Sequence, residues 1–170
     1  MARGGRAPDP GRILNYTTEV SVDKTVSEIE AVLRAKGARS ITEVYGHDGR
    51  IIAVEFIFDT GWGPRPFLLP ANPDAVLGLM IERRNVGKSA YWRGYIDPRK
   101  PPRSLVEQAE RTAWRTIKDW VEAQMALMAT RQVTFEQVFL PYALVEENRT
   151  LFDVYAERQA ALPPGEPPRS

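Results

Sequence analysis

A single long amphipathic pattern, over residues 104–129, constrains the fold of this chain more than any other feature of its sequence. Apolar side chains recur along it at helical spacing, and Glu107 and Arg111 lie four residues apart on its polar side. Ser104 and Glu107 have the spacing of a capping box at its start. A helix of about 25 residues is about 37 Å long. We therefore expect one long helix that covers an entire small sheet.

Four short runs in which apolar and polar residues alternate predict the strands of that sheet. They cover residues 15–22, 38–45, 50–59 and 65–69. Asp48 and Gly49 lie between the second and third runs, and an Asp-Gly pair between β-rich segments is a strong hairpin signal. The third run is apolar on both faces and is expected to be an interior strand. The fourth ends at Pro70, which is typical of an edge strand.

Capping residues and apolar spacing predict the other helices. Thr25 and Glu28 have capping-box spacing at the start of a helix over residues 25–36, and Asn72 caps a second helix before Pro73. Residues 86–102 hold too many glycines and prolines for a continuous helix and are expected to form a long loop. A short turn and a final helix follow the long helix. The predicted fold class is α+β, with a small, mostly antiparallel sheet of about four strands in the order β-α-β-β-β-α-loop-α-α.

A chain of 170 residues is long enough for one ordinary domain, which we place at residues 14–160. Residues 1–13 are basic and aperiodic, and residues 161–170 contain four prolines, so both ends are expected to be disordered tails. No run of apolar residues is long enough for a membrane span, and no secretory signal is recognisable. We therefore expect a cytoplasmic protein with no membrane partner.

The composition argues against most catalytic chemistry. The chain has no cysteine and one histidine, His47, so thiolate nucleophiles, disulfides and Cys- or His-rich metal sites are excluded. No motif indicates a cofactor or a metal ion, and none are expected. Glu43, Glu55 and Asp59 are the only carboxylates that the hairpin is able to hold for acid–base or nuclease chemistry. We expect them to be solvated or paired with arginine, and we expect the protein not to be an enzyme.

One segment departs from the nearly neutral average of 23 basic and 22 acidic residues. Residues 83–103 contain seven lysines and arginines against Asp97 alone, interleaved with aromatic residues. Cations attract phosphates, and aromatic rings stack on unpaired bases, so this composition favours single-stranded DNA or another nucleic acid. The candidate nucleic-acid-binding residues are Arg83, Arg84, Lys88, Tyr91, Trp92, Arg93, Tyr95, Arg99, Lys100, Trp62 and Arg65. The alternative is a solvated basic loop whose aromatic rings anchor it to the domain and whose cations meet acidic groups.

A second hypothesis assigns the chain to a different class, that of protein-interaction modules. The long helix carries four large apolar side chains at helical spacing, Trp114, Trp120, Met125 and Met128. Residues 133–142 are apolar enough to lie across a surface as a strap. Such side chains usually form core, because a small sheet needs a covering helix. If they are exposed instead, they predict a homodimer or docking on another protein.

Three phrases of the sequence carry a family resemblance. They are NYTTEVSVDKTVSEIEAVLRAKGA, FLLPAN, and QAERTAWRTIKDWVEAQMALM followed by VFLPY. Over residues 14–155 the chain resembles a group of short, uncharacterised proteins of phage and prophage-like contexts. The resemblance implies no activity and carries over no catalytic residue. The context implies an accessory role in replication, recombination or takeover of the host.

Overall fold

The structure is a computed structural model that describes residues 13–160. The two predicted tails lie outside this range, apart from residue 13. The elements, in chain order, are α1 (Val22–Ala35), β1 (Ser40–Tyr45), β2 (Ile51–Thr60), β3 (Gly63–Pro70), α2 (Pro73–Asn85), α3 (Arg103–Ala129), α4 (Phe135–Phe139), the 3-10 turn η1 (Leu140–Tyr142), β4 (Leu144–Glu146), β5 (Arg149–Thr150) and α5 (Leu151–Ala160).

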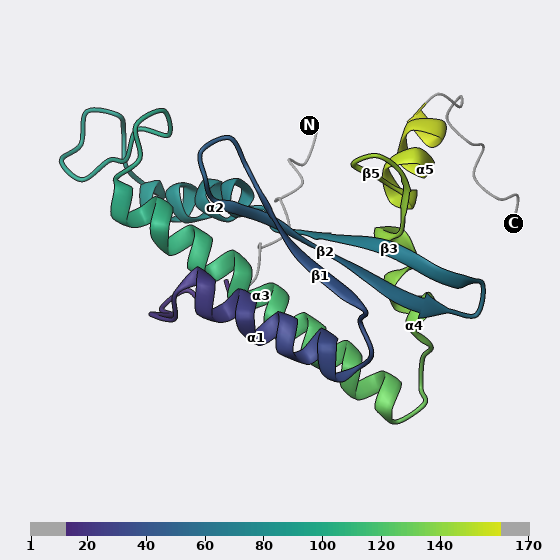
Figure 1. Ribbon diagram of the computed structural model, residues 1–170. Coiled ribbons are helices and arrows are strands. Elements are labelled where there is room, and N and C mark those ends of the chain that lie inside the picture. The colour runs from purple at the N-terminus through teal and green to yellow at the C-terminus, as the bar shows by residue number, and fades with distance from the viewer. Residues whose placement is uncertain (1–12, 161–170) are drawn as a thin grey trace, which may run out of the picture.

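The main sheet is antiparallel, with β2 between β1 and β3, and β4 and β5 form a separate small hairpin (Figure 1). The α+β class and the interior position of β2 are therefore confirmed. The hairpin of β1 and β2 turns at Asp48 and Gly49, whose φ of 76° is in the left-handed region that favours glycine. The short hairpin of β4 and β5 was not predicted, because its strands are too short to show a period.

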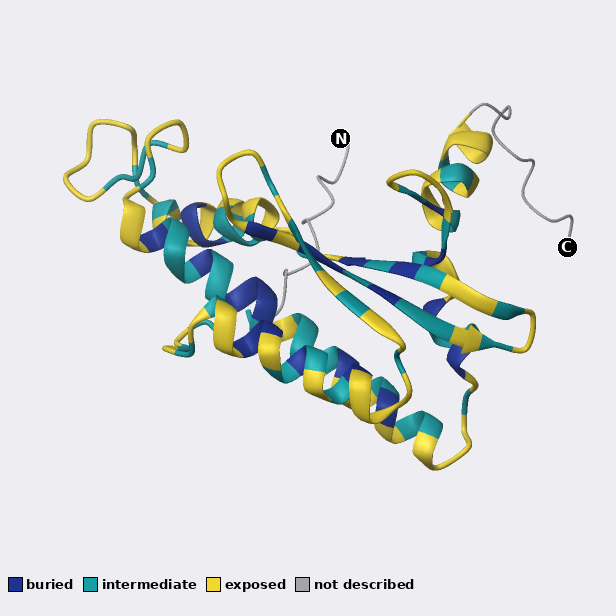
Figure 2. Cartoon of the chain, in the orientation of Figure 1, coloured by how far each residue is buried: buried dark blue, intermediate teal, exposed yellow. Residues whose placement is uncertain are grey.

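Helix α3 runs along the molecule, with α1 beside it, and both lie on one face of the sheet (Figure 1). Its buried side chains include Trp114 and Val121, which pack with Ile29 of α1 and with Phe56 and Phe67 of the sheet. Figure 2 shows this buried layer between sheet and helices. The predicted role of the long helix as the cover of the sheet is confirmed.

The strand predicted at residues 15–22 does not form. Asn15 has a φ of 59° within a turn, and α1 already begins at Val22. Side chains of α3 take the place of a neighbouring strand, since Gln108 Nε2 donates to the carbonyls of Tyr16 (2.8 Å) and Thr18 (3.0 Å). The alternation of apolar and polar residues over 15–22 therefore belongs to an irregular segment that packs against α3, not to a strand.

Two of the predicted helix caps are displaced. Ser21, not Thr25, caps α1 by accepting the Lys24 N–H, and Thr25 is buried. Helix α3 starts one residue earlier than predicted, after Pro102, with no side-chain cap. A capping box does form at Thr134 of α4, where a short capped turn was expected.

Candidate nucleic-acid interface

The basic loop, residues 86–102, extends from the domain at the end where α2 joins α3 (Figure 1, upper left). It is not covered by any other element in that view. Figure 2 shows most of it as exposed.

The base of the basic loop is held by the side chain of Asn85, the last residue of α2. Its Oδ1 accepts the Ile96 N–H at 2.9 Å, and its Nδ2 donates to the Ile96 carbonyl at 2.8 Å. Ile96 in turn packs on the apolar cluster that Met80 and Leu105 share between α2 and α3. The loop is therefore an ordered projection with a fixed base, and sequence reasoning missed Asn85 because its partner is eleven residues away in an aperiodic segment.

Two aromatic rings of the basic loop are exposed. Tyr91 is 99% exposed and Trp92 is 65% exposed. The Trp92 N–H donates to the Ser89 carbonyl at 2.9 Å, and the Tyr95 N–H donates to the Trp92 carbonyl at 3.0 Å, so successive turns fix this part of the backbone. Tyr95 is half-buried. Tyr91 and Trp92 are therefore accessible to a ligand, whereas Tyr95 is partly packed against the protein. Their role in binding nucleic acid stays a prediction.

Several cations of this region have partners. Arg99 pairs with Asp97 at 3.2 Å, and the Arg99 backbone N–H and side chain together hold the pKa of Asp97 below its ordinary value. Arg84 donates to the Tyr16 hydroxyl at 2.9 Å, and Lys88 donates to the Gly94 carbonyl at 3.3 Å. Arg84 and Arg99 each use two guanidinium nitrogens in these contacts, and both residues are exposed.

Arg93 and Lys100 are the least engaged cations of the basic loop. Both are exposed, and neither has a carboxylate of residues 13–160 within ion-pair distance. Arg83 is exposed in the last turn of α2, at the base of the basic loop. The basic loop therefore carries the exposed cations Arg93 and Lys100 as well as two exposed rings.

Trp62 and Arg65 do not belong to this surface. They lie at the turn of β2 and β3, at the opposite end of the molecule from the basic loop (Figure 1). There they line a largely apolar cavity of about 210 Å³ with Glu136 of α4. The Glu136 carboxylate accepts the Gly61 N–H at 2.9 Å, and this bond holds its pKa below the ordinary value. Grouping Trp62 and Arg65 with the loop required this end of the sheet to lie close to the loop. The topology instead places the two at opposite ends of the molecule.

The three hairpin carboxylates do not converge. Glu43 is paired with Val54 in the ladder, so their side chains lie on the same face of the sheet. Glu55 follows Val54 in β2 and therefore projects from the opposite face. Glu43 accepts the hydroxyl of Tyr45, and this bond raises the tyrosine pKa above its ordinary value. Asp59 pairs with Arg39 at 2.6 Å, as expected. Among residues 13–160, no three histidine or acidic side chains are placed to hold a metal ion.

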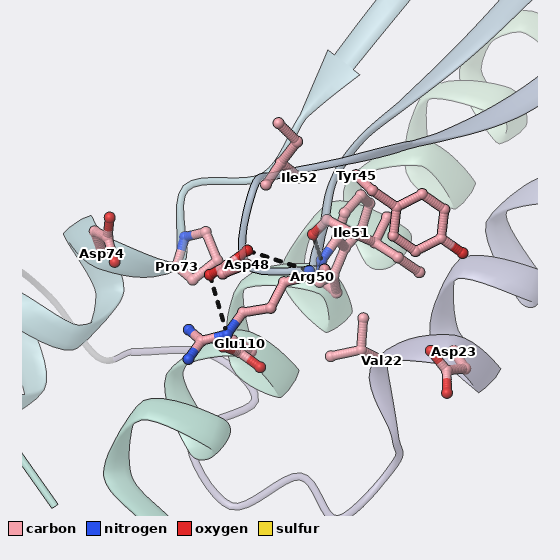
Figure 3. Close-up of a pocket in the computed structure, with 12 residues that line it drawn as sticks. Val22, Asp23, Tyr45, Asp48, Arg50, Ile51, Ile52, Pro73, Asp74 and Glu110 are labelled. Atoms are coloured by element: carbon pink, nitrogen blue, oxygen red, sulfur yellow. Dashed lines mark hydrogen bonds and ion pairs between the residues drawn. The ribbon is translucent and has the colours of Figure 1, made fainter. Parts of the chain in front are cut away.

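A cavity that the sequence did not indicate lies between the β1–β2 turn and helices α1, α2 and α3 (Figure 3). It has a volume of about 310 Å³. Arg50 crosses it and pairs with Glu110 at 2.5 Å and with Asp48 at 3.3 Å. Burial raises the pKa of Glu110, and Arg50 opposes this effect. No local signal was available, since Arg50 and Glu110 are far apart in the sequence.

The predicted docking surfaces of the long helix and the strap are covered by the chain itself. Phe135 and Phe139 of the strap are buried, and Phe139 packs edge-on against Trp120 of α3 with ring centroids 5.4 Å apart. Trp114 is 1% exposed and its indole Nε1 donates to the Ile51 carbonyl at 3.3 Å. These aromatic residues are core.

No helix within residues 13–160 combines the length and apolar character that crossing a membrane requires. Comparison with protein-family models, with curated proteins and with solved structures gives no match for this chain. The resemblance to phage-associated proteins therefore stays a prediction.

Proposed function

We propose that the chain binds single-stranded nucleic acid through the basic loop and has no catalytic role of its own. The observation that carries this proposal is the full exposure of Tyr91 beside the largely exposed Trp92 and the unpaired charge of Arg93. By contrast, the large ring of Trp114 is buried in the core of the same protein. Rings held in water on an ordered loop support a role in stacking against a flat ligand.

Each component of the loop has a defined part in the proposed complex. Tyr91 and Trp92 stack on unpaired bases, which contributes about 1–3 kcal/mol per base. Arg93, Lys100 and Arg83 contact phosphates and release the counterions condensed on them. Arg99 is able to join them only by exchanging its contact with Asp97 for a phosphate. Because stacking and charge do not read base edges, the expected binding is tolerant of sequence.

The test is a titration of labelled oligothymidylate, about 20 nucleotides long, followed by fluorescence anisotropy at increasing salt. Trp92→Ala is expected to weaken binding by about 1–3 kcal/mol, or roughly 5- to 150-fold. Trp62→Ala is the matched control, since Trp62 is 66% exposed at the other end of the molecule. This control is expected to bind as the wild type does.

Two double variants distinguish the effect of the loop's own cations from the effect of the net charge of the protein. Arg93→Ala with Lys100→Ala is expected to reduce the slope of log K against log salt by about 0.7 for each lost contact. Lys24→Ala with Lys36→Ala removes the same charge from the exposed ends of α1 and is expected to leave the slope unchanged. Absence of binding at low salt, or equal loss in both pairs, contradicts the proposal.

A further inference from the structure

The two edges of the main sheet differ in what they offer to another strand. On β3, Pro64, Pro66 and Pro70 face Asp59, Ile57 and Ala53 of β2 in the ladder. Proline has no N–H, so these positions are the ones whose backbone faces away from β2. The outer edge of β3 therefore lacks three donors, and Phe67 of this strand also bridges to Ala143. Both features block the addition of a strand at this edge.

The outer edge of β1 contains no proline, and its one register shift lies near its end, between Val44 and Tyr45. In β2, the backbone N–H and C=O groups of Ala53, Glu55 and Ile57 point away from β3. They therefore bond to the backbone of Val44, Thr42 and Ser40 of β1. The alternate residues Ile41 and Glu43 then direct their backbone groups outward. Within residues 13–160 no other strand pairs with this edge. An unprotected row of donors and acceptors is a template for pairing with another chain.

We propose that β1 pairs antiparallel with β1 of a second copy of this chain, which joins the two sheets into one. In the register that we assign, Ile41 lies opposite Glu43 of the second copy, and Thr42 lies opposite Thr42 of the second copy. Each Ile41–Glu43 pair exchanges two backbone hydrogen bonds, so the two symmetric pairs form four. The contact is isologous, as expected for a symmetric dimer.

The neighbouring registers are less favourable. A shift toward the C-terminus places Glu43 opposite Glu43 of the second copy, and like charges directly opposite are destabilising. A further shift in the same direction uses Tyr45, where the ladder of β1 is already irregular. A shift toward the N-terminus requires outward backbone groups at Arg39, whose N–H bonds inward to the Ile57 carbonyl at 2.9 Å. The assigned register also gives a Thr–Thr cross-strand pair, which is favourable.

The absence of cysteine from the sequence allows a direct test of the register. In Thr42→Cys, the two thiols belong to a non-hydrogen-bonded pair with Cα atoms about 4.5 Å apart, within the range of a disulfide. Mild oxidation is expected to give a covalent dimer. Ser40→Cys is the matched control on the same strand and face, with its two thiols offset by about 13 Å along the strand. This control is expected to remain monomeric on a denaturing gel.

The dimer itself is tested by sedimentation velocity over a dilution series of the full chain. Glu43→Pro removes an outward N–H without removing a bond of the internal ladder, and it is expected to give a monomer with a native circular dichroism spectrum. Glu43→Ala keeps the N–H and is expected to retain the concentration-dependent dimer. A wild-type monomer at every concentration up to about 1 mM, the range of weak association, overturns the proposal. So does a dimer that persists in Glu43→Pro, or equal cross-linking of the two cysteine variants.

This inference does not depend on the proposed function. The basic loop and β1 lie on different parts of the molecule (Figure 1). A monomer that binds oligothymidylate contradicts only the pairing of β1, and a dimer that does not bind it contradicts only the role of the loop.

Discussion

At the scale of single residues, Glu110 is the carboxyl group of residues 13–160 whose surroundings most favour its neutral form. Burial raises its pKa, and the ion pair with Arg50 only partly opposes this. A raised folded-state pKa means that the folded protein holds the proton more tightly than the unfolded chain does. This stabilising contribution is complete below the unfolded pKa of about 4.3 and is lost as the pH rises through the raised pKa of the folded protein.

Glu110→Gln is therefore expected to flatten the decrease in stability as the pH rises above about 4.3, by no more than about 1.4 kcal/mol per pH unit, the limit for one proton. Urea denaturation at several pH values measures this change. Glu107→Gln is the control, since Glu107 is 46% exposed at its side chain on the same helix. Equal slopes for Glu110→Gln and the wild type contradict the expectation.

Trp114 is the residue whose loss we expect to cost the most stability. It is among the largest fully buried side chains, and its indole N–H satisfies the Ile51 carbonyl. Trp114→Ala is expected to lower the free energy of unfolding by about 3–5 kcal/mol, because it leaves a cavity. The exposed Trp62→Ala is expected to change it by less than about 0.5 kcal/mol. Urea denaturation of both variants compares a buried with an exposed residue of the same type.

At the scale of elements, the basic loop depends on the two hydrogen bonds between Asn85 and Ile96. Asn85→Ala removes both bonds, and Asn85→Asp keeps the acceptor while losing the donor. Hydrogen exchange at the Ile96 amide is therefore expected to be fastest in Asn85→Ala and intermediate in Asn85→Asp. Trypsin is expected to cut Asn85→Ala sooner than the wild type after Lys88 and Arg93. Unchanged exchange in Asn85→Ala contradicts the assignment of this side chain as the anchor.

The elements also show what the sequence was able to predict. Helix α3 and the hairpin of β1 and β2 follow from local period and turn chemistry, which short-range physics determines. The segment at 15–22 has the period of a strand, but whether it pairs depends on a distant partner, and Gln108 of α3 satisfies its carbonyls instead. The separation of Trp62 from Trp92 and the meeting of Arg50 with Glu110 likewise depend on topology. The composition of the sequence was sufficient to identify the basic loop. The hydrogen bonds from Asn85 that anchor the loop are visible only in the structure.

At the scale of the whole molecule, α3 joins two apolar clusters of unequal size. The larger lies between the sheet, α1 and α4, and it contains Val54 and Phe56. The smaller lies between α2 and the first half of α3, and its buried members are Met80, Ile81, Leu105 and Ala109. A small cluster carries less hydrophobic stabilisation, because this stabilisation scales with buried apolar area. The end of the molecule that carries the basic loop is therefore expected to open before the sheet does.

Native-state hydrogen exchange at low denaturant tests this order of opening. The amides of Met80 and Ile81 are expected to exchange through an opening of lower free energy than those of Val54 and Phe56. Met80→Ala creates a cavity in the smaller cluster and is expected to lower the opening free energy of α2 by about 2–5 kcal/mol. The β2 amides are expected to keep their protection in this variant, whereas Val54→Ala lowers the protection of all four. If Met80→Ala shifts all four amides equally, the two clusters unfold as one cooperative unit, and the basic loop is as stable as the sheet.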